Sequence, residues 1–138
     1  MRRSPLFFTV VLTAAAVPAH AQGGMKLPDV AGVWVAKSMV GPKDSVVNRS
    51  QVVATADGQG WTMKFAGRAA IPLRVVAAGG DSVVVEAGPF PSVLRPGQTV
   101  SSLRIVNHYK GDASTGTFEA HYGNGDVLRG KTAGTRSK

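Results

Sequence analysis

The chain has 138 residues, no cysteine, and 16 Lys and Arg against 8 Asp and Glu, which gives a formal net charge of +8. The lack of cysteine excludes a disulfide framework, a cysteine-based zinc site and a lipidated cysteine anchor. The basic residues are scattered without a run of four, so the clustered charge of a nucleic-acid-binding protein is absent and no nucleic-acid partner is expected. The charge instead favours contact with an anionic component of a cell envelope.

Residues 1–21 have the three parts of an export signal. Arg2 and Arg3 give a positive start, the following stretch is mostly apolar or small, and Ala19-His20-Ala21 forms a small-x-small cleavage site. The apolar stretch is shorter than the ~20 residues that a membrane-spanning helix needs, so we expect no insertion into the membrane. The sequence therefore predicts a secreted or periplasmic protein that is cleaved near Ala21.

The rest of the chain divides into a short segment and one domain. We expect residues 22–30 to be a flexible N-terminal segment and residues 31–138 to form a single domain. Within this domain, short alternating stretches are separated by Gly, Asp, Pro and Ser clusters, which are typical of turns. We expect strands near residues 32–39, 45–55, 61–65, 71–75, 83–85, 99–109, 116–122 and 126–135.

The stretch from Trp61 to Phe65 alternates most clearly. Trp61, Met63 and Phe65 fall on one face, while the residues between them are Thr and Lys, a pattern that predicts one buried and one solvated face. Eight such strands with short connections predict an all-β fold, an eight-stranded antiparallel up-and-down barrel. A two-sheet β-sandwich is the alternative that the pattern leaves open.

The first expected strand carries a family resemblance. Gly32-Val33-Trp34 resembles the G-x-W of the first strand in the calycins, the lipocalin and avidin-like barrels, and Arg129 or Arg136 is placed like the basic residue that covers that Trp. The resemblance implies that Trp34 closes one end of a barrel and that an Arg of the last strand stacks on its ring. It concerns the architecture and implies no particular ligand.

The segment Gly88 to Gln98 is the longest connection that we expect. It holds three prolines, and its Phe90, Val93 and Leu94 are apolar where a solvated loop would be polar. Such a segment covers one barrel end, either as a plug or as a lid over a ligand cavity, and both interpretations remain open. Candidate ligand contacts are Phe90 and Leu94 of this segment and the polar strand residues Asn48, Asn107 and Tyr109. The alternative for the three polar residues is that they are satisfied polar groups at the barrel rim.

Metal and catalytic sites are not expected. His108, His121 and Glu119 lie on neighbouring strands, but the alternation turns them outward, so we interpret them as surface pairs. No Gly-x-Ser-x-Gly elbow occurs. The repeated Asp-Ser-Val-Val at Asp44 and Asp81 is interpreted as turn chemistry rather than as paired carboxylates. We therefore expect no catalytic residue, no cofactor and no enzyme.

Two functional hypotheses remain. In the first, the protein is a non-enzymatic binder that holds a small apolar molecule in a barrel cavity. In the second, the barrel has a solid core and serves as an interaction module of the cell envelope. Small inward residues such as Ala36 and Ala120 leave room for a cavity, and the interior volume separates the two hypotheses. The sequence predicts no oligomeric state.

Overall fold

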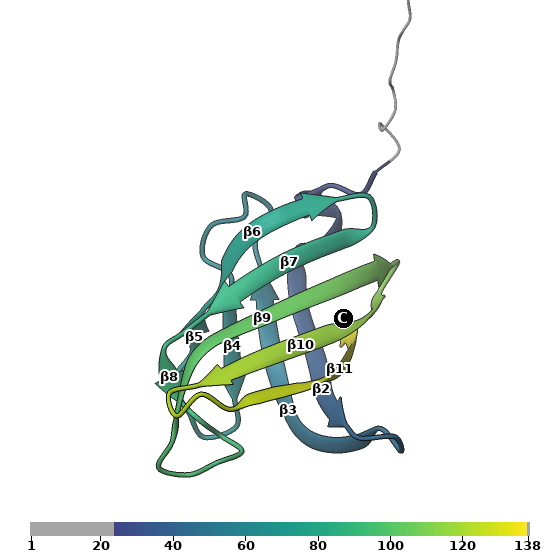
Figure 1. Ribbon diagram of the computed structural model, residues 1–138. Coiled ribbons are helices and arrows are strands. Elements are labelled where there is room, and N and C mark those ends of the chain that lie inside the picture. Colours follow the sequence, from purple (N-terminus) through teal and green to yellow (C-terminus); the bar gives the residue numbers. More distant parts are fainter. Residues whose placement is uncertain (1–23, 138) are drawn as a thin grey trace, which may run out of the picture.

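The computed structural model describes residues 24–137 of this protein, and the predicted export signal lies outside them. These residues form an antiparallel, all-β barrel that is nearly closed (Figure 1). Within residues 24–137, no helix is long and apolar enough to cross a membrane. The elements are the 3₁₀-helix η2 (Leu27–Val30) and the strands β2 (Gly32–Val40), β3 (Ser45–Ala54), β4 (Thr62–Phe65), β5 (Ile71–Pro72), β6 (Arg74–Gly79), β7 (Ser82–Ala87), β8 (Phe90–Pro91), β9 (Thr99–Lys110), β10 (Ala113–Tyr122) and β11 (Val127–Arg136).

One sheet contains all the strands, in the order β5-β4-β3-β2-β11-β10-β9-β7-β6, with β8 paired to β9. The first and last long strands pair, and Trp34 of β2 lies opposite Arg136 of β11. The two edge strands β5 and β6 follow one another directly in the chain, so the sheet curls round until its two edges lie near one another. A single curled sheet excludes the two-sheet sandwich that the sequence left open.

The strand count differs from the predicted eight, since the sheet has ten strands. The stretch 71–75, expected as one strand, divides at Leu73 into β5 and β6. Pro72 has no N–H for a ladder bond, and the Leu73 N–H instead donates to the Trp61 carbonyl at 2.9 Å. The tenth strand is β8, where Phe90–Pro91 pair with β9 inside the segment expected to be a loop.

The core follows the predicted alternation. Trp61 is 1% exposed, Met63 and Phe65 are also buried, and Lys64 between them is exposed, so this prediction is confirmed. Large side chains project inward from β4, β9 and β10, such as Phe65 and Phe118, whereas the inward positions of β2, β3 and β11 carry mostly small ones, such as Ala36. The interior is therefore filled unevenly.

One end of the barrel is closed by Trp34, which is 3% exposed. Its indole Nε1 donates to the Val30 carbonyl at 2.9 Å. The guanidinium of Arg136 lies over the ring with its Cζ 4.9 Å from the centroid, and the Tyr109 ring meets it edge-on at 5.0 Å between centroids. Arg136 Nη1 also donates to the Ala31 carbonyl at 2.8 Å. This bond links the last strand to the chain just before the first strand.

The segment 22–30, expected to be flexible, takes part in this closure over the residues that the structure describes. Its η2 helix places Val30 in the core at 2% exposure, and Leu27 contacts the core as well. The Met25 N–H donates to the Gly80 carbonyl at 2.6 Å. The physical reason is that Val30 supplies both an apolar side chain to the barrel end and the carbonyl that the Trp34 indole needs.

Candidate functional site

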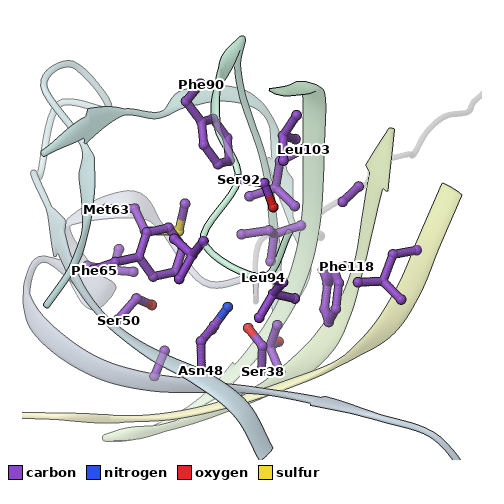
Figure 2. Close-up of a pocket in the computed structure, with 18 of the residues that line it drawn as sticks. Ser38, Asn48, Ser50, Met63, Phe65, Phe90, Ser92, Leu94, Leu103 and Phe118 are labelled. Carbon is purple, nitrogen blue, oxygen red and sulfur yellow. The ribbon is translucent and has the colours of Figure 1, made fainter. Parts of the chain in front are cut away.

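A cavity of about 80 Å³ lies inside the barrel, away from the end that Trp34 closes (Figure 2). Side chains of seven strands and of the segment 92–94 surround it, and no Asp, Glu, Lys, Arg or His of the described chain is among them. The lining residues are Ala36, Ser38, Asn48, Ser50, Val52, Met63, Phe65, Phe90, Ser92, Val93, Leu94, Val100, Leu103, Ile105, Asn107, Ser114, Phe118, Ala120, Tyr122, Leu128, Thr132 and Ala133.

The side chains around the cavity are of two kinds. Figure 2 shows the large apolar side chains of Phe65 and Phe118 on opposite sides, with Leu94 between them. The polar side chains of Ser38 and Asn48 face this apolar group from the wall formed by β2 and β3. The cavity exists because the small side chains of β2 and β3 do not fill the space that the large side chains opposite leave between them.

The segment over the cavity is anchored to the barrel by Ser92. Ser92 is 3% exposed, its Oγ lies 3.1 Å from the Tyr122 hydroxyl, and it accepts a bond from the Arg95 N–H at 3.0 Å. The Arg95 guanidinium lies 4.4 Å above the Tyr122 ring and pairs with Asp126 at 3.0 Å. The base of the segment is therefore fixed, and the half-buried Leu94 at its tip contacts the cavity.

The two asparagines of the cavity wall have different partners. Asn107 Oδ1 accepts a hydrogen bond from Thr132 Oγ1 at 2.7 Å. Burial raises the pKa of Tyr109, and the nearby Asn107 side chain lowers it by less. Asn48 Oδ1, in contrast, is the one buried side-chain oxygen or nitrogen within residues 24–137 that lacks a hydrogen-bond partner.

The five candidate ligand contacts that the sequence predicts lie in two places. Phe90, Leu94, Asn48 and Asn107 line the cavity. Tyr109 does not line it, because its ring lies against Trp34 at the closed end. Of the predicted polar contacts, the Asn107 oxygen is thus already bonded to Thr132, Tyr109 lies elsewhere, and Asn48 Oδ1 has no partner.

The structure places the two candidate arginines on different faces of β11. Arg136 lies over Trp34, as described above. Arg129 lies on the outer face, opposite Glu119 in the β10–β11 register, and its Nε donates to Glu119 Oε2 at 2.7 Å. Because β11 alternates, the even-numbered Arg136 shares the inward face of Thr132, whereas the odd-numbered Arg129 points into solvent.

The two histidines within residues 24–137 each form a separate pair on the outer surface. His108 Nδ1 lies 3.0 Å from Asp81 Oδ1, and His121 Nε2 lies 2.6 Å from Glu119 Oε1. The bonds from His121 and then Arg129 hold the pKa of Glu119 below its usual value, and the bond from His108 does the same for the pKa of Asp81. No group of three potential metal ligands occurs in the part of the chain that the structure describes.

A basic face lies on the outside of β2, β3 and β4. Lys37 and Arg49 are directly opposite one another in the β2–β3 register, and Lys64 follows on β4. All three are exposed, and among the residues 24–137 that are described none of them has an ion-pair partner. Two shallow grooves meet at Arg49, one shared with Lys37 and the other with Lys64.

Several residues of the site were missed at the sequence level. Ser38 and Ser50 line the cavity because they share the inward parity of Trp34 and Val52 on their strands, and strict alternation from Trp34 would have found Ser38. The anchoring role of Ser92 depends on Tyr122, 30 residues away in the chain, and no local pattern signals it.

The features that carry the calycin resemblance, Gly32, Trp34 and Arg136, lie together at the closed end of the barrel. Gly32 has a positive φ of 135°, and a Cβ at this position would lie 3.2 Å from Arg136 Cδ. A glycine therefore permits both the backbone conformation and the approach of the arginine. Comparison of the chain with protein-family models, with curated proteins and with solved structures found no match.

Proposed function

We propose that this is an exported, non-enzymatic, calycin-like protein that holds one small apolar molecule in the barrel cavity. The observation that carries the proposal is the largely apolar cavity beneath a segment whose own apolar side chains, Phe90 and Leu94, face into it. Binding sites for small molecules are concave and largely apolar, with few polar groups. The lining supplies no carboxylate, amine, guanidinium or imidazole for acid–base chemistry, which favours binding over catalysis.

The cavity size limits the ligand. Its volume of about 80 Å³ is roughly half of the ~150 Å³ of an apolar cavity that admits benzene. In this proposal a ring-sized ligand requires the half-buried Leu94 to move aside, so residues 93–94 act as a lid rather than as a plug. Its anchor at Ser92 and Arg95 stays in place during such a movement.

The double variant Phe90→Ser/Leu94→Ser tests this proposal. In the wild type, toluene is expected to shift the ¹³C-methyl resonance of Met63, which lines the cavity, and to leave that of Met39, which does not. The double variant is expected to lose the Met63 shift, because the apolar cover is gone. Because Leu94 is only half-buried, the single variant Leu94→Ser is expected to fold. It replaces the double variant in this test if the double variant does not fold.

The matched control is Val76→Ser, which makes the same kind of change at a side chain that is 46% exposed and remote from the cavity. It should retain the Met63 shift. Equal shifts of Met63 and Met39 in the wild type, or an unchanged Met63 shift in a folded Leu94→Ser variant, would contradict the proposal.

The basic face favours a second function, contact with an anionic polymer of the cell envelope. Like charges directly opposite one another on neighbouring strands are destabilising, so the uncompensated pair Lys37 and Arg49 is best explained by a polyanion that neutralises it. Heparin serves as the probe. The variant Lys37→Gln/Arg49→Gln should bind it about tenfold more weakly at low salt, whereas Arg74→Gln/Lys110→Gln, with the same charge loss on other strands, should bind nearly as the wild type does. Equal losses in both variants would show that only net charge matters.

A further inference from the structure

The Asn48 side chain is placed in a way that its local surroundings do not explain. Asn48 lies opposite Ser38 in the β2–β3 register, and its amide nitrogen points into the cavity (Figure 2). The amide makes no hydrogen bond within the described residues, and its Oδ1 is buried without a partner. A buried polar group without a partner lowers the stability of the native state, so the fold alone would favour an apolar residue here.

The Asn48 amide differs in this respect from two other polar groups of the lining. The oxygen of Asn107 is engaged by Thr132, and the hydroxyl of Ser92 is engaged by Tyr122 and the Arg95 N–H. The amide nitrogen of Asn48 is therefore an unoccupied N–H donor that faces the space where a ligand would lie. An N–H donor in an apolar cavity selects a molecule with a hydrogen-bond acceptor.

The charge of the lining restricts the acceptor further. No basic side chain lines the cavity, so an anionic acceptor such as a carboxylate would be buried without a counter-charge, at a large cost in free energy. Resting on the proposed binding function, we propose that the cavity takes an uncharged molecule with one acceptor group, such as a ketone, and that Asn48 Nδ2 donates a hydrogen bond to this group.

Two probes of the same shape test this proposal, cyclohexanone and methylenecyclohexane, which carry C=O and C=CH₂ on the same ring. The variant Asn48→Leu should bind cyclohexanone about tenfold more weakly, because the donor is lost, and should bind methylenecyclohexane as well as the wild type or better. In the wild type, cyclohexanone should also shift the ¹H–¹⁵N cross-peaks of the Asn48 side-chain amide, and methylenecyclohexane should leave them nearly unchanged.

Thermal unfolding without ligand gives a second readout, with Asn107→Leu as the matched control. Asn48→Leu is expected to keep or raise the melting temperature, because it removes an unsatisfied group, whereas Asn107→Leu is expected to lower it, because it breaks the hydrogen bond with Thr132. A large drop for Asn48→Leu would assign Asn48 a structural role and overturn the inference. Equal weakening of both probes by Asn48→Leu would overturn it as well, and if neither probe moves the Met63 resonance of the wild type, the binding function itself fails.

Discussion

Replacing Trp34 by alanine is expected to lower the free energy of unfolding by about 3–5 kcal/mol, the usual cost of truncating a buried aromatic side chain. The indole is 3% exposed, and it holds the Val30 carbonyl, the Arg136 guanidinium and the Tyr109 ring at one barrel end. Small domains are stable by only about 5–15 kcal/mol, so much of the stability would be lost. Urea unfolding followed by circular dichroism measures this change.

Two arginine variants control for the mechanism of that loss. Arg136→Ala should cost about 2 kcal/mol, because it removes charge-assisted hydrogen bonds to Ala31 and Asp112 together with the contact on the Trp34 ring. Arg129→Ala, at a side chain that is 69% exposed, should stay within about 0.5 kcal/mol of the wild type. Similar losses for the two arginine variants would contradict closure of the barrel by Arg136.

Replacing Gly116 by alanine is expected to cost about 3 kcal/mol or more, because the interior offers no room for a methyl group at this position. An added Cβ would lie 1.9 Å from the Val106 carbonyl oxygen and 2.9 Å from Asn107 Cα. Both are backbone atoms, so relief requires the strands β9 and β10 to move apart. The cavity wall at Asn107 would shift with them, and toluene binding should weaken in parallel with stability.

Gly79→Ala is the matched control for Gly116. It makes the same substitution in a strand, but its added Cβ meets nothing within 4 Å, so we expect a change within about 0.5 kcal/mol. Comparable urea midpoints for the two alanine variants would mean that β9 and β10 can separate without cost, contrary to the close approach in the structure.

Much of the fold was accessible from the sequence because the alternation of side chains is a local property. The faces of Trp61 and Lys64 and the pairing of the first and last strands follow from this alternation and from barrel closure. The division of 71–75 was only partly accessible. Pro72, which has no N–H, marks a weak point in the strand, but the break itself depends on the bond between the Leu73 N–H and the Trp61 carbonyl, which no local pattern indicates.

The candidate site was less accessible, because it depends on contacts between distant strands. Alternation shows that Asn48, Asn107 and Tyr109 are candidates for the inward face. It does not show that Thr132 occupies the Asn107 oxygen, or that Tyr109 lies against Trp34. Which polar group remains free for a ligand is decided by side-chain pairing across the barrel, and only the structure distinguishes Asn48 from Asn107.

The most direct test of the proposed binding function is to ask whether the protein carries a small molecule in its own host. Wild-type protein and the Phe90→Ser/Leu94→Ser variant would be purified in parallel from that host, extracted with organic solvent and analysed by mass spectrometry. The binding account predicts about one equivalent of a small uncharged molecule in the wild-type extract and its loss from the variant. The same extract from both proteins, with no molecule enriched in the wild type, would contradict it.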